Sequence, residues 1–365
     1  MWLTELHNQR QKHFRSLLVT LSVLNVASLA TAINLVLILN PEDRVSVRRG
    51  GALTALGLVY FMTLFEVLTM LGLYTGAGVR FRRKYSLTGG ELLDIINKVV
   101  SAVQAAFCCV TGAVVCLWSC TRDFMRSSHY MSEAYAWFGA AYFFYDIWSM
   151  YLVHLEMNAK DNMNYIKSKI QRAKNGAAAL SAGDGKKPVG TSFLDYCRHE
   201  PVILFHHLFI GGFGFLVIVY LRGELGDCTF GFVYLMELST PFVSLRGILA
   251  RLRLKAARLY LANGLLMLLT FFVCRVASLP YVCLLYSRVT GLSYIEAIKS
   301  LPTGCKISIS VLMMPQLYWF YLMSAGALKL FFSKADKSAG SGEKLASLPG
   351  GKSTSLSAGD ADKRS

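Results

Sequence analysis

Eight long apolar stretches constrain the fold of this chain more than any other feature. They lie near residues 17–39, 52–74, 99–119, 134–153, 202–221, 229–249, 261–286 and 307–332. Each approaches the roughly 20 helical residues that cross the hydrocarbon core of a bilayer. The composition agrees, because 54% of the residues are hydrophobic and 16% are charged, whereas about 25% are charged in soluble domains. The sequence predicts an all-α, polytopic transmembrane helix bundle of about eight spans and excludes a disordered chain, a collagen-like fibre and a typical soluble globule.

The first apolar stretch, 17–39, follows Arg10, Lys12 and Arg15, as the hydrophobic region of a signal peptide would. It is longer than such a region usually is, and the N-P-E-D sequence at 40–43 is not a small-residue cleavage site. We therefore expect a retained span or signal anchor rather than a cleaved leader.

The basic residues indicate the orientation of the chain. One side of the predicted bundle comprises the N-terminus, the loops 75–98, 154–201 and 250–260, and the tail from 329. This side holds 27 of the 38 Lys and Arg residues, whereas the opposite loops hold 9. Because cytosolic loops carry the excess of Lys and Arg, we expect both termini in the cytosol, which excludes a rhodopsin-type seven-helix receptor. The net charge of +16 lies in short loops between apolar blocks, so it does not indicate a nucleic-acid partner.

Strongly polar side chains inside predicted spans are unfavourable in lipid and therefore indicate function or pairing. They are Glu66, Gln104, Asp146, His206, His207, Glu237, Arg275 and Gln316. From the helical rise, Asp146 and His206 share one level, roughly 10 and 6 Å from the cytosolic ends of their spans. Glu237, Arg275 and Gln316 form a second level, roughly 12 to 16 Å from the opposite ends.

The second level is most simply explained as an ion pair between Glu237 and Arg275, capped by the amide of Gln316. An unpaired Arg at this depth would be unfavourable by several kcal/mol, so a carboxylate partner is the economical explanation. The alternative is a substrate-binding site in which the same three side chains hold a lipid headgroup.

The adjacent His206 and His207 are the sharper signal. Neighbouring helical residues point about 100° apart, so one can face a cavity while the other contacts a neighbouring helix. A neutral imidazole can act as a general base, and the carboxylate of Asp146 at the same depth could fix its tautomer. The alternative is a pair of structural histidines bonded to neighbouring helices. A metal site has little support, because the other histidines show no ligand spacing.

Aromatic residues gather near both polar levels, with Tyr142 close to Asp146 and Trp319 close to Gln316. Aromatic belts at the membrane interfaces explain such clusters, and so does the lining of a tunnel for an acyl chain. The sequence does not separate the two interpretations.

These polar blocks resemble a known family. They are Y-F-F-Y-D at 142–146, the histidine pair, E-L-S-T-P-F at 237–242, Arg275 with Pro280-Tyr281, and P-Q-L-Y-W-F at 315–320. Together they resemble the TLC domain of the translocating-chain-associating proteins, the longevity-assurance ceramide synthases and a ceroid-lipofuscinosis protein. They are most similar to the TLC-domain-containing protein 3 subgroup.

The resemblance implies a division of the chain into three parts. Residues 1–89 form an N-terminal cytosolic segment with two spans, and residues 90–332 form a TLC-like domain with a cytosolic loop at 154–201. Residues 333–365 form a cytosolic tail, which is Ser-, Gly- and Lys-rich and lacks hydrophobic periodicity, so we expect disorder there.

The resemblance also implies a function in ceramide and sphingolipid synthesis, by acyl-CoA-dependent N-acylation of a long-chain base. His206 and His207 match the active-site histidines of ceramide synthases, and Asp146 matches the family aspartate. Glu237, Arg275, Gln316, Tyr142 and Trp319 would then bind the substrate.

No bound cofactor is expected, because acyl-CoA would act as a co-substrate. The expected partners are the lipid bilayer, acyl-CoA and the long-chain base. An endoplasmic reticulum membrane is expected, with the Golgi or plasma membrane as alternatives, and the oligomeric state is open. The alternative function is a non-catalytic regulator of lipid homeostasis or a sorting receptor with a lipid-binding cavity.

Overall fold

The computed structural model describes residues 2–174, 190, 192–223 and 225–346, and all regular elements in these ranges are helical. The α-helices are α1 (Trp2–Leu37), α2 (Val47–Tyr74), α3 (Gly76–Tyr85), α4 (Gly89–Val115), α5 (Tyr130–Lys174), α6 (Phe193–His199), α7 (Pro201–Leu208), α8 (Cys228–Leu235), α9 (Thr240–Arg251), α10 (Arg258–Phe271), α11 (Ser278–Thr290), α12 (Tyr294–Ser300) and α13 (Thr303–Ala346). Short irregular segments join some of them: Cys116–Cys120, Phe209–Gly214, Val217–Leu221 and Phe272–Ala277 are π-helical, and Met236–Ser239 is 3₁₀-helical.

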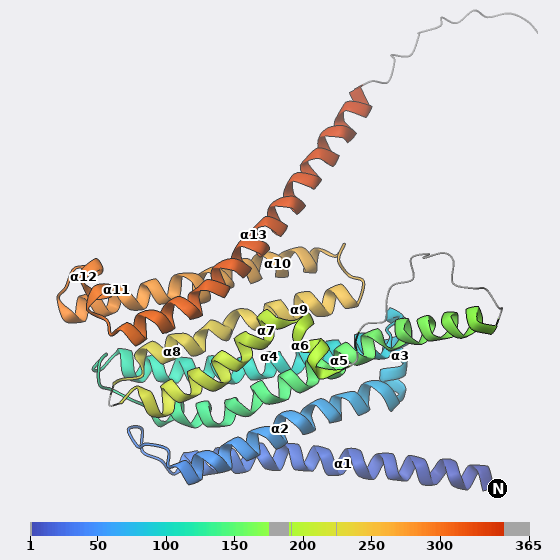
Figure 1. Ribbon diagram of the computed structural model, residues 1–365, viewed down its shortest axis with the longest axis horizontal. Coiled ribbons are helices and arrows are strands. Elements are labelled where there is room, and N and C mark those ends of the chain that lie inside the picture. Colours follow the sequence, from blue (N-terminus) through green and yellow to red (C-terminus); the bar gives the residue numbers. More distant parts are fainter. Residues whose placement is uncertain (1, 175–189, 191, 224, 347–365) are drawn as a thin grey trace, which may run out of the picture.

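Seven helical spans in the described residues are long and apolar enough to cross a membrane. They are His13–Leu37, Val47–Tyr74, Gly89–Cys120, Pro201–Leu221, Cys228–Arg251, Arg258–Thr290 and Thr303–Leu328. The eighth predicted stretch, 134–153, lies on α5, which runs along the same axis and packs against α2 and α4 (Figure 1). α5 is less apolar than the other spans because it carries polar residues such as Asp146 and Ser149. These side chains are buried inside the bundle and do not face lipid. The all-α polytopic bundle is confirmed.

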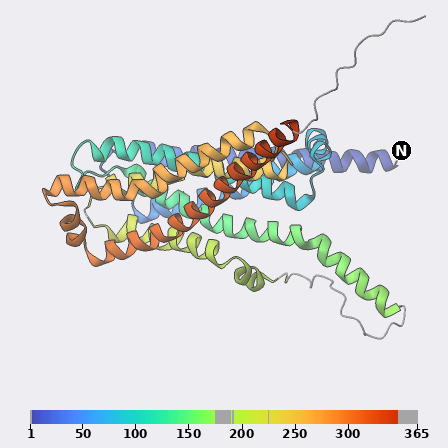
Figure 2. The ribbon, with the colours of Figure 1, turned by 90° about the horizontal axis from the view of Figure 1, so that it is seen from above.

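The bundle has two ends, which differ in their chemistry. The disulfide end contains Cys120 and Cys228, which form a disulfide, and the connections between α1 and α2 and between α4 and α5. The basic end contains α3 and the connection between α9 and α10. α1 begins and α13 ends toward the basic end, and α5 also extends past the bundle there (Figures 1 and 2).

α4 begins at Gly89 rather than at residue 99, because its polar first turns are capped and paired. The Thr88 side chain accepts a hydrogen bond from the backbone of Glu91 (3.2 Å), and the Glu91 carboxylate accepts one from the backbone of Thr88 (2.9 Å). This capping box satisfies two backbone donors at the helix start. Arg253 then donates to Glu91 (2.6 Å), which ties the start of α4 to the end of α9.

The centre of the bundle is an aromatic layer between α2 and α5. Phe61 packs edge-on against Tyr142, with ring centroids 5.3 Å apart, and Phe65 packs edge-on against Tyr145 at 5.8 Å. All four side chains are buried. Large rings in such edge-to-face contact stabilise packing beyond the area that they bury, so they fix the face that α5 presents to its neighbours.

Two glycines allow close helix packing. A Cβ on Gly57 of α2 would collide with the carbonyl oxygen of Phe138 on α5, and a Cβ on Gly112 of α4 would lie 2.7 Å from the carbonyl oxygen of Gly231 on α8. Small residues bring helix backbones together in membrane bundles. These two contacts bring α5 close to α2 and α8 close to α4.

The disulfide end is held by contacts that the sequence analysis did not predict. The Cys120–Cys228 disulfide joins the end of the α4 span to the start of α8, across 108 residues of sequence. Buried Glu133 of α5 accepts hydrogen bonds from the Arg222 guanidinium (3.0 Å) and from the backbone N–H of Val45 (2.9 Å). This end of the bundle is therefore tied together covalently and by buried ion pairs.

The helices exceed two predicted boundaries. α5 continues to Lys174, into the predicted loop 154–201, and α13 continues to Ala346, into the tail predicted as disordered. Extending an existing helix adds one hydrogen bond for each residue fixed, and Ala, Lys and Leu in these extensions favour helix. Residues 175–189, 191 and 347–365 lie outside the described residues, and the domain division at residue 89 stays a prediction.

The outer surface of the bundle is apolar. Val26, Leu117, Leu221, Leu269 and Met314 come from different spans, and each is more than half exposed. Soluble proteins rarely expose large contiguous apolar surfaces, whereas such side chains match the hydrocarbon of a bilayer. The protein is a multi-pass membrane protein, and the lipid bilayer is its environment.

Candidate functional site

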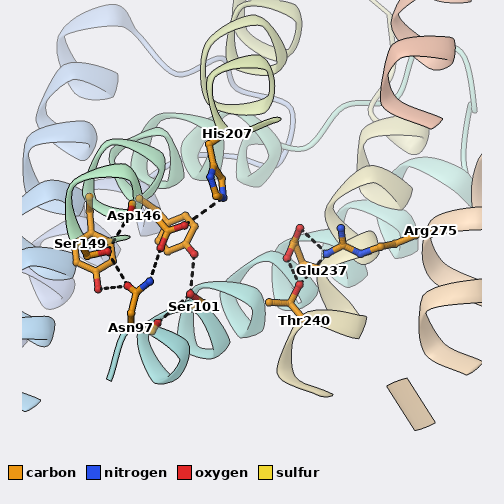
Figure 3. Close-up of polar contacts among 10 residues, drawn as sticks. Asn97, Ser101, Asp146, Ser149, His207, Glu237, Thr240 and Arg275 are labelled. Carbon is orange, nitrogen blue, oxygen red and sulfur yellow. Dashed lines mark hydrogen bonds and ion pairs between the residues drawn. The ribbon is translucent and has the colours of Figure 1, made fainter. Parts of the chain in front are cut away.

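His207 of α7 and Asp146 of α5 form a buried polar pair (Figure 3), six residues after the start of α7, which lies toward the basic end (Figure 1). The imidazole Nε2 lies 3.2 Å from Asp146 Oδ2, and both side chains are about nine-tenths buried or more. Pro201 at the start of α7 fits this position, because a first-turn proline removes a backbone donor that would have no helical partner. The predicted pairing of Asp146 with a histidine is therefore present.

Asn97 of α4 orients the carboxylate of this pair. Its amide nitrogen donates to Asp146 Oδ1 (3.1 Å), and its amide oxygen accepts from Tyr145 (2.9 Å) and Ser149 (2.7 Å) (Figure 3). Each Asp146 oxygen thus has a partner, and so has the Asn97 amide. A buried network with all members bonded holds a single geometry, so Asp146 cannot turn away from His207 without breaking several bonds.

The pairing leaves one nitrogen of His207 free. Asp146 Oδ2 accepts, so a neutral imidazole carries its proton on Nε2; this tautomer is inferred from the bonding. Nδ1 is buried and has no hydrogen-bond partner among the described residues. The arrangement is an imidazole with an oriented, unbonded lone pair, backed by a carboxylate. It can accept a proton or act as a nucleophile.

His206 points away from this pair. Its ring packs edge-on against Trp319 of α13, with ring centroids 5.0 Å apart and planes at 86°. The two histidines therefore have different environments, as expected for adjacent helical residues. Only His207 bonds to Asp146.

Glu237 and Arg275 form the second cluster. Arg275 lies on the π-helical segment Phe272–Ala277, and its Nη2 lies 3.0 Å from Glu237 Oε1. Further donors of the same guanidinium reach Thr240 (2.8 Å), Ser239 (2.8 Å) and the amide oxygen of Gln316 (3.3 Å). The predicted ion pair is thus present (Figure 3), and the Gln316 cap is present as well.

The two clusters are linked through α13. Gln316 bonds to Arg275, and Trp319, three residues further along α13, contacts His206. Three residues correspond to a rise of about 4.5 Å. The level of Asp146 and the histidines and the level of Glu237 and Arg275 therefore lie at different depths in the bundle. Contacts with α13 connect them.

Tyr142 lies in the core of this region. Its hydroxyl donates to Ser101 (3.0 Å), and its ring packs against Phe61 and Phe143. It is 5% exposed, so in this structure it supports α4 against α5. Substrate contact by Tyr142 stays a prediction, as do the catalytic and binding roles of the other predicted residues.

A sequence model of the TLC domain matches residues 94–325, well over half of the chain. The chain belongs to the TLC-domain family. The matched region contains both clusters and runs from the first turns of α4 into α13. Membership in the TLC-domain family indicates a membrane protein with a lipid-related function.

Of the polar face of α4 in this TLC domain, only Gln104 was singled out from the sequence, and the other four residues were missed. Asn97, Ser101, Gln104, Cys108 and Thr111 recur at spacings of four and three residues, which places them on one helical face. Four of them are buried, and the fifth, Ser101, is partly buried. This 3–4 spacing of polar residues inside an apolar helix is the signal that identifies the Asp146 partner from sequence.

A buried tyrosine lies where α6 meets α5, at the basic end of the TLC domain. Tyr196 packs against Tyr151 and His154, with ring centroids 5.7 and 5.4 Å apart. Burial, with a smaller effect from the Asp146 carboxylate, raises the pKa of Tyr196 to about 12. Its hydroxyl therefore keeps its proton well above neutral pH and can donate a hydrogen bond.

Proposed function

We propose that this protein transfers the acyl group of an acyl-CoA to the amine of a long-chain base, as ceramide synthases do. The observation that carries the proposal is the His207–Asp146 pair, in which Nδ1 of His207 is buried, oriented and unbonded. Enzymes activate acyl acceptors with such a base, held by a third group that fixes its tautomer. The resemblance to ceramide synthases, whose active-site histidines match His206 and His207, supports the same chemistry.

In the proposed reaction, the amine nitrogen attacks the thioester carbonyl carbon. The N–C bond forms and the C–S bond breaks, while the amine proton passes to Nδ1 of His207 and then to the departing thiolate. The products are an amide and the free thiol of coenzyme A. Asp146 holds the imidazole and stabilises its transient positive charge. In the alternative sequence, Nδ1 attacks first and an acyl-imidazole forms before the amine arrives.

The basic end supplies charges that suit the phosphates of acyl-CoA. A depression of about 390 Å³ there is lined by Ala250, Arg251, Arg253 and Lys255. The two arginines also pair with carboxylates of α4, whereas no ion pair includes Lys255 in the described part of the chain. Lys and Arg side chains bind phosphate groups strongly. We therefore place acyl-CoA entry at this end, with the acyl chain directed toward His207.

The orientation follows from two independent features. Lys and Arg are concentrated on the side of the termini, and the disulfide lies at the opposite end. Disulfides persist in oxidising compartments such as the lumen of the endoplasmic reticulum, and basic loops face the cytosol. We propose an endoplasmic reticulum membrane with both termini cytosolic, which puts His207 on the acyl-CoA side.

The experiment is an acyl-transfer assay on purified protein in nanodiscs, with a panel of acyl-CoAs and amine acceptors. We expect amide formation by the wild type and a loss of at least 100-fold in His207→Ala, within the range of a removed general base. Asp146→Asn should retain partial activity, because the base remains but its orientation and charge stabilisation suffer. His199→Ala is the matched control, since His199 is an exposed histidine at the basic end.

Two outcomes decide between the interpretations. Full activity in His207→Ala would contradict the assigned base. No activity in the wild type with any pair of substrates, in protein that still binds lipid, would favour the non-catalytic regulator. An acyl adduct on His207, detected by intact mass before the amine is added, would favour the acyl-imidazole sequence.

A further inference from the structure

A groove between α1 and α2 contains a carboxylate that the polar site does not use. The groove has a volume of about 540 Å³ and lies in the half of the bundle nearer the basic end. Leu17 and Leu21 of α1 and Met70 of α2 line it with apolar surface, and Glu66 of α2 supplies the carboxylate. Glu66 lies eight residues before the end of α2 at Tyr74, which corresponds to a depth of about 12 Å.

Glu66 is distinguished by its lack of a partner among the side chains that the structure describes. Other acidic side chains of the spanning helices pair with Arg, Lys or His: Glu91 with Arg253, Asp94 with Arg251 and Lys98, Glu133 with Arg222, Asp146 with His207, and Glu237 with Arg275. Glu66 has no hydrogen bond or ion pair with any residue that the structure describes. An ionisable residue inside a membrane span is rarely left unpaired without a function.

We propose that this groove binds the protonated amine of a lipid, with Glu66 as the counter-ion and the hydrocarbon chain along Leu17 and Leu21. A long apolar wall with one carboxylate matches an amphiphile with an ammonium group at one end of its chain. His13 at the rim is exposed and forms no ion pair with Glu66, so the described residues leave the carboxylate available. Long-chain bases and aminophospholipids share the required ammonium group.

The groove is separate from the His207–Asp146 pair. Phe65, next to Glu66 in sequence, packs against Tyr145 and Trp148 with ring centroids 5.8 and 5.9 Å apart. This aromatic layer stands between the groove and the polar site. An amine held at Glu66 is therefore outside the reaction site, and the inference does not depend on acyl transfer.

The test is photo-crosslinking on the full chain in phosphatidylcholine nanodiscs. The probes are a diazirine-bearing long-chain base, a diazirine-bearing phosphatidylethanolamine, and the N-acetylated form of the first probe, which lacks the charge. Labelled peptides are mapped by mass spectrometry. We expect the amine probe to label the α1 and α2 peptides about tenfold more than its acetylated form. Comparison of the first two probes identifies the source of the amine.

The variants test the carboxylate directly. Glu66→Gln should reduce labelling about tenfold, the order expected for one charge-assisted hydrogen bond. Glu156→Gln is the matched control, because it removes an exposed carboxylate near the basic end without touching the groove. Glu66→Gln should fold normally, since no described residue loses a bond. Leu17→Trp should also block labelling, by filling the groove while keeping the charge.

Equal labelling by the acetylated probe, equal labelling of Glu66→Gln and wild type, or labelling confined to other helices would each overturn the inference. His207→Ala should label like the wild type. A protein without acyl-transfer activity that still shows Glu66-dependent labelling would refute the proposed function and leave this site standing.

Discussion

Arg275→Met tests whether the deep ion pair is a structural unit. The Arg275 side chain is 9% exposed, and its guanidinium bonds to Glu237, Thr240, Ser239 and Gln316. Interhelical hydrogen bonds inside membranes contribute about 0.6 kcal/mol each on average, so loss of the three neutral partners accounts for about 2 kcal/mol. Stranding the Glu237 carboxylate, which is 27% exposed, adds to this. Breaking a fully buried pair from one side destabilises by about 3 to 5 kcal/mol, so we expect a total near the lower end of that range.

The double variant separates the loss of the neutral hydrogen bonds from the effect of the stranded Glu237 charge. Glu237→Gln/Arg275→Met removes the stranded charge, so only the neutral bonds remain lost and we expect a destabilisation of about 2 kcal/mol. Unfolding would be followed by tryptophan fluorescence during titration with a denaturing detergent. Arg246→Met is the control, because Arg246 contacts the ring of Tyr260 and forms no ion pair among the described residues. A double variant as unstable as Arg275→Met would refute the pairing.

Two further predictions test the packing and the orientation. Gly57→Ala should lower stability by about 1 to 3 kcal/mol in thermal unfolding, because its methyl group would collide with the carbonyl oxygen of Phe138, whereas Gly51→Ala, with nothing within 4 Å, should be neutral or stabilising. In variants that keep a single cysteine, Cys197 should react with a membrane-impermeant maleimide in sealed microsomes, and the exposed Cys305 at the start of α13 only after detergent; the reverse pattern would invert the proposed orientation.

Features that depend on local composition could be predicted from the sequence. A span requires only enough consecutive apolar residues, so the predicted stretches coincide with helices of the bundle. The pairing of Glu237 with Arg275 could be predicted as well, because a lone guanidinium at that depth has few alternatives. The same reasoning led to His207 and Asp146, although it could not tell which histidine would bond.

Features that depend on distant contacts could not be predicted. Cys120 and Cys228 are two of nine cysteines, and spacing alone does not reveal which cysteines pair. Asn97 was assigned to a loop, because Glu91, Asp94 and Lys98 around it make the sequence look exposed. In the structure those charges pair with one another or with α9, and their neutralisation lets the helix begin earlier.

The key side chains also lie where the helices depart from the regular period. Arg275 lies on a π-helical segment and Glu237 on a 3₁₀-helical one, while His207 comes two residues before the π-helical segment Phe209–Gly214. A change in the number of residues per turn rotates the following side chains about the helix axis, relative to a regular helix. A 3.6-residue pattern therefore cannot predict which helix face a residue in or after such a segment lies on. π-Helical turns are uncommon and occur frequently at functional sites. These irregular turns lie beside both clusters. They set the direction in which the polar side chains point, which the hydrophobic pattern of the spans does not determine.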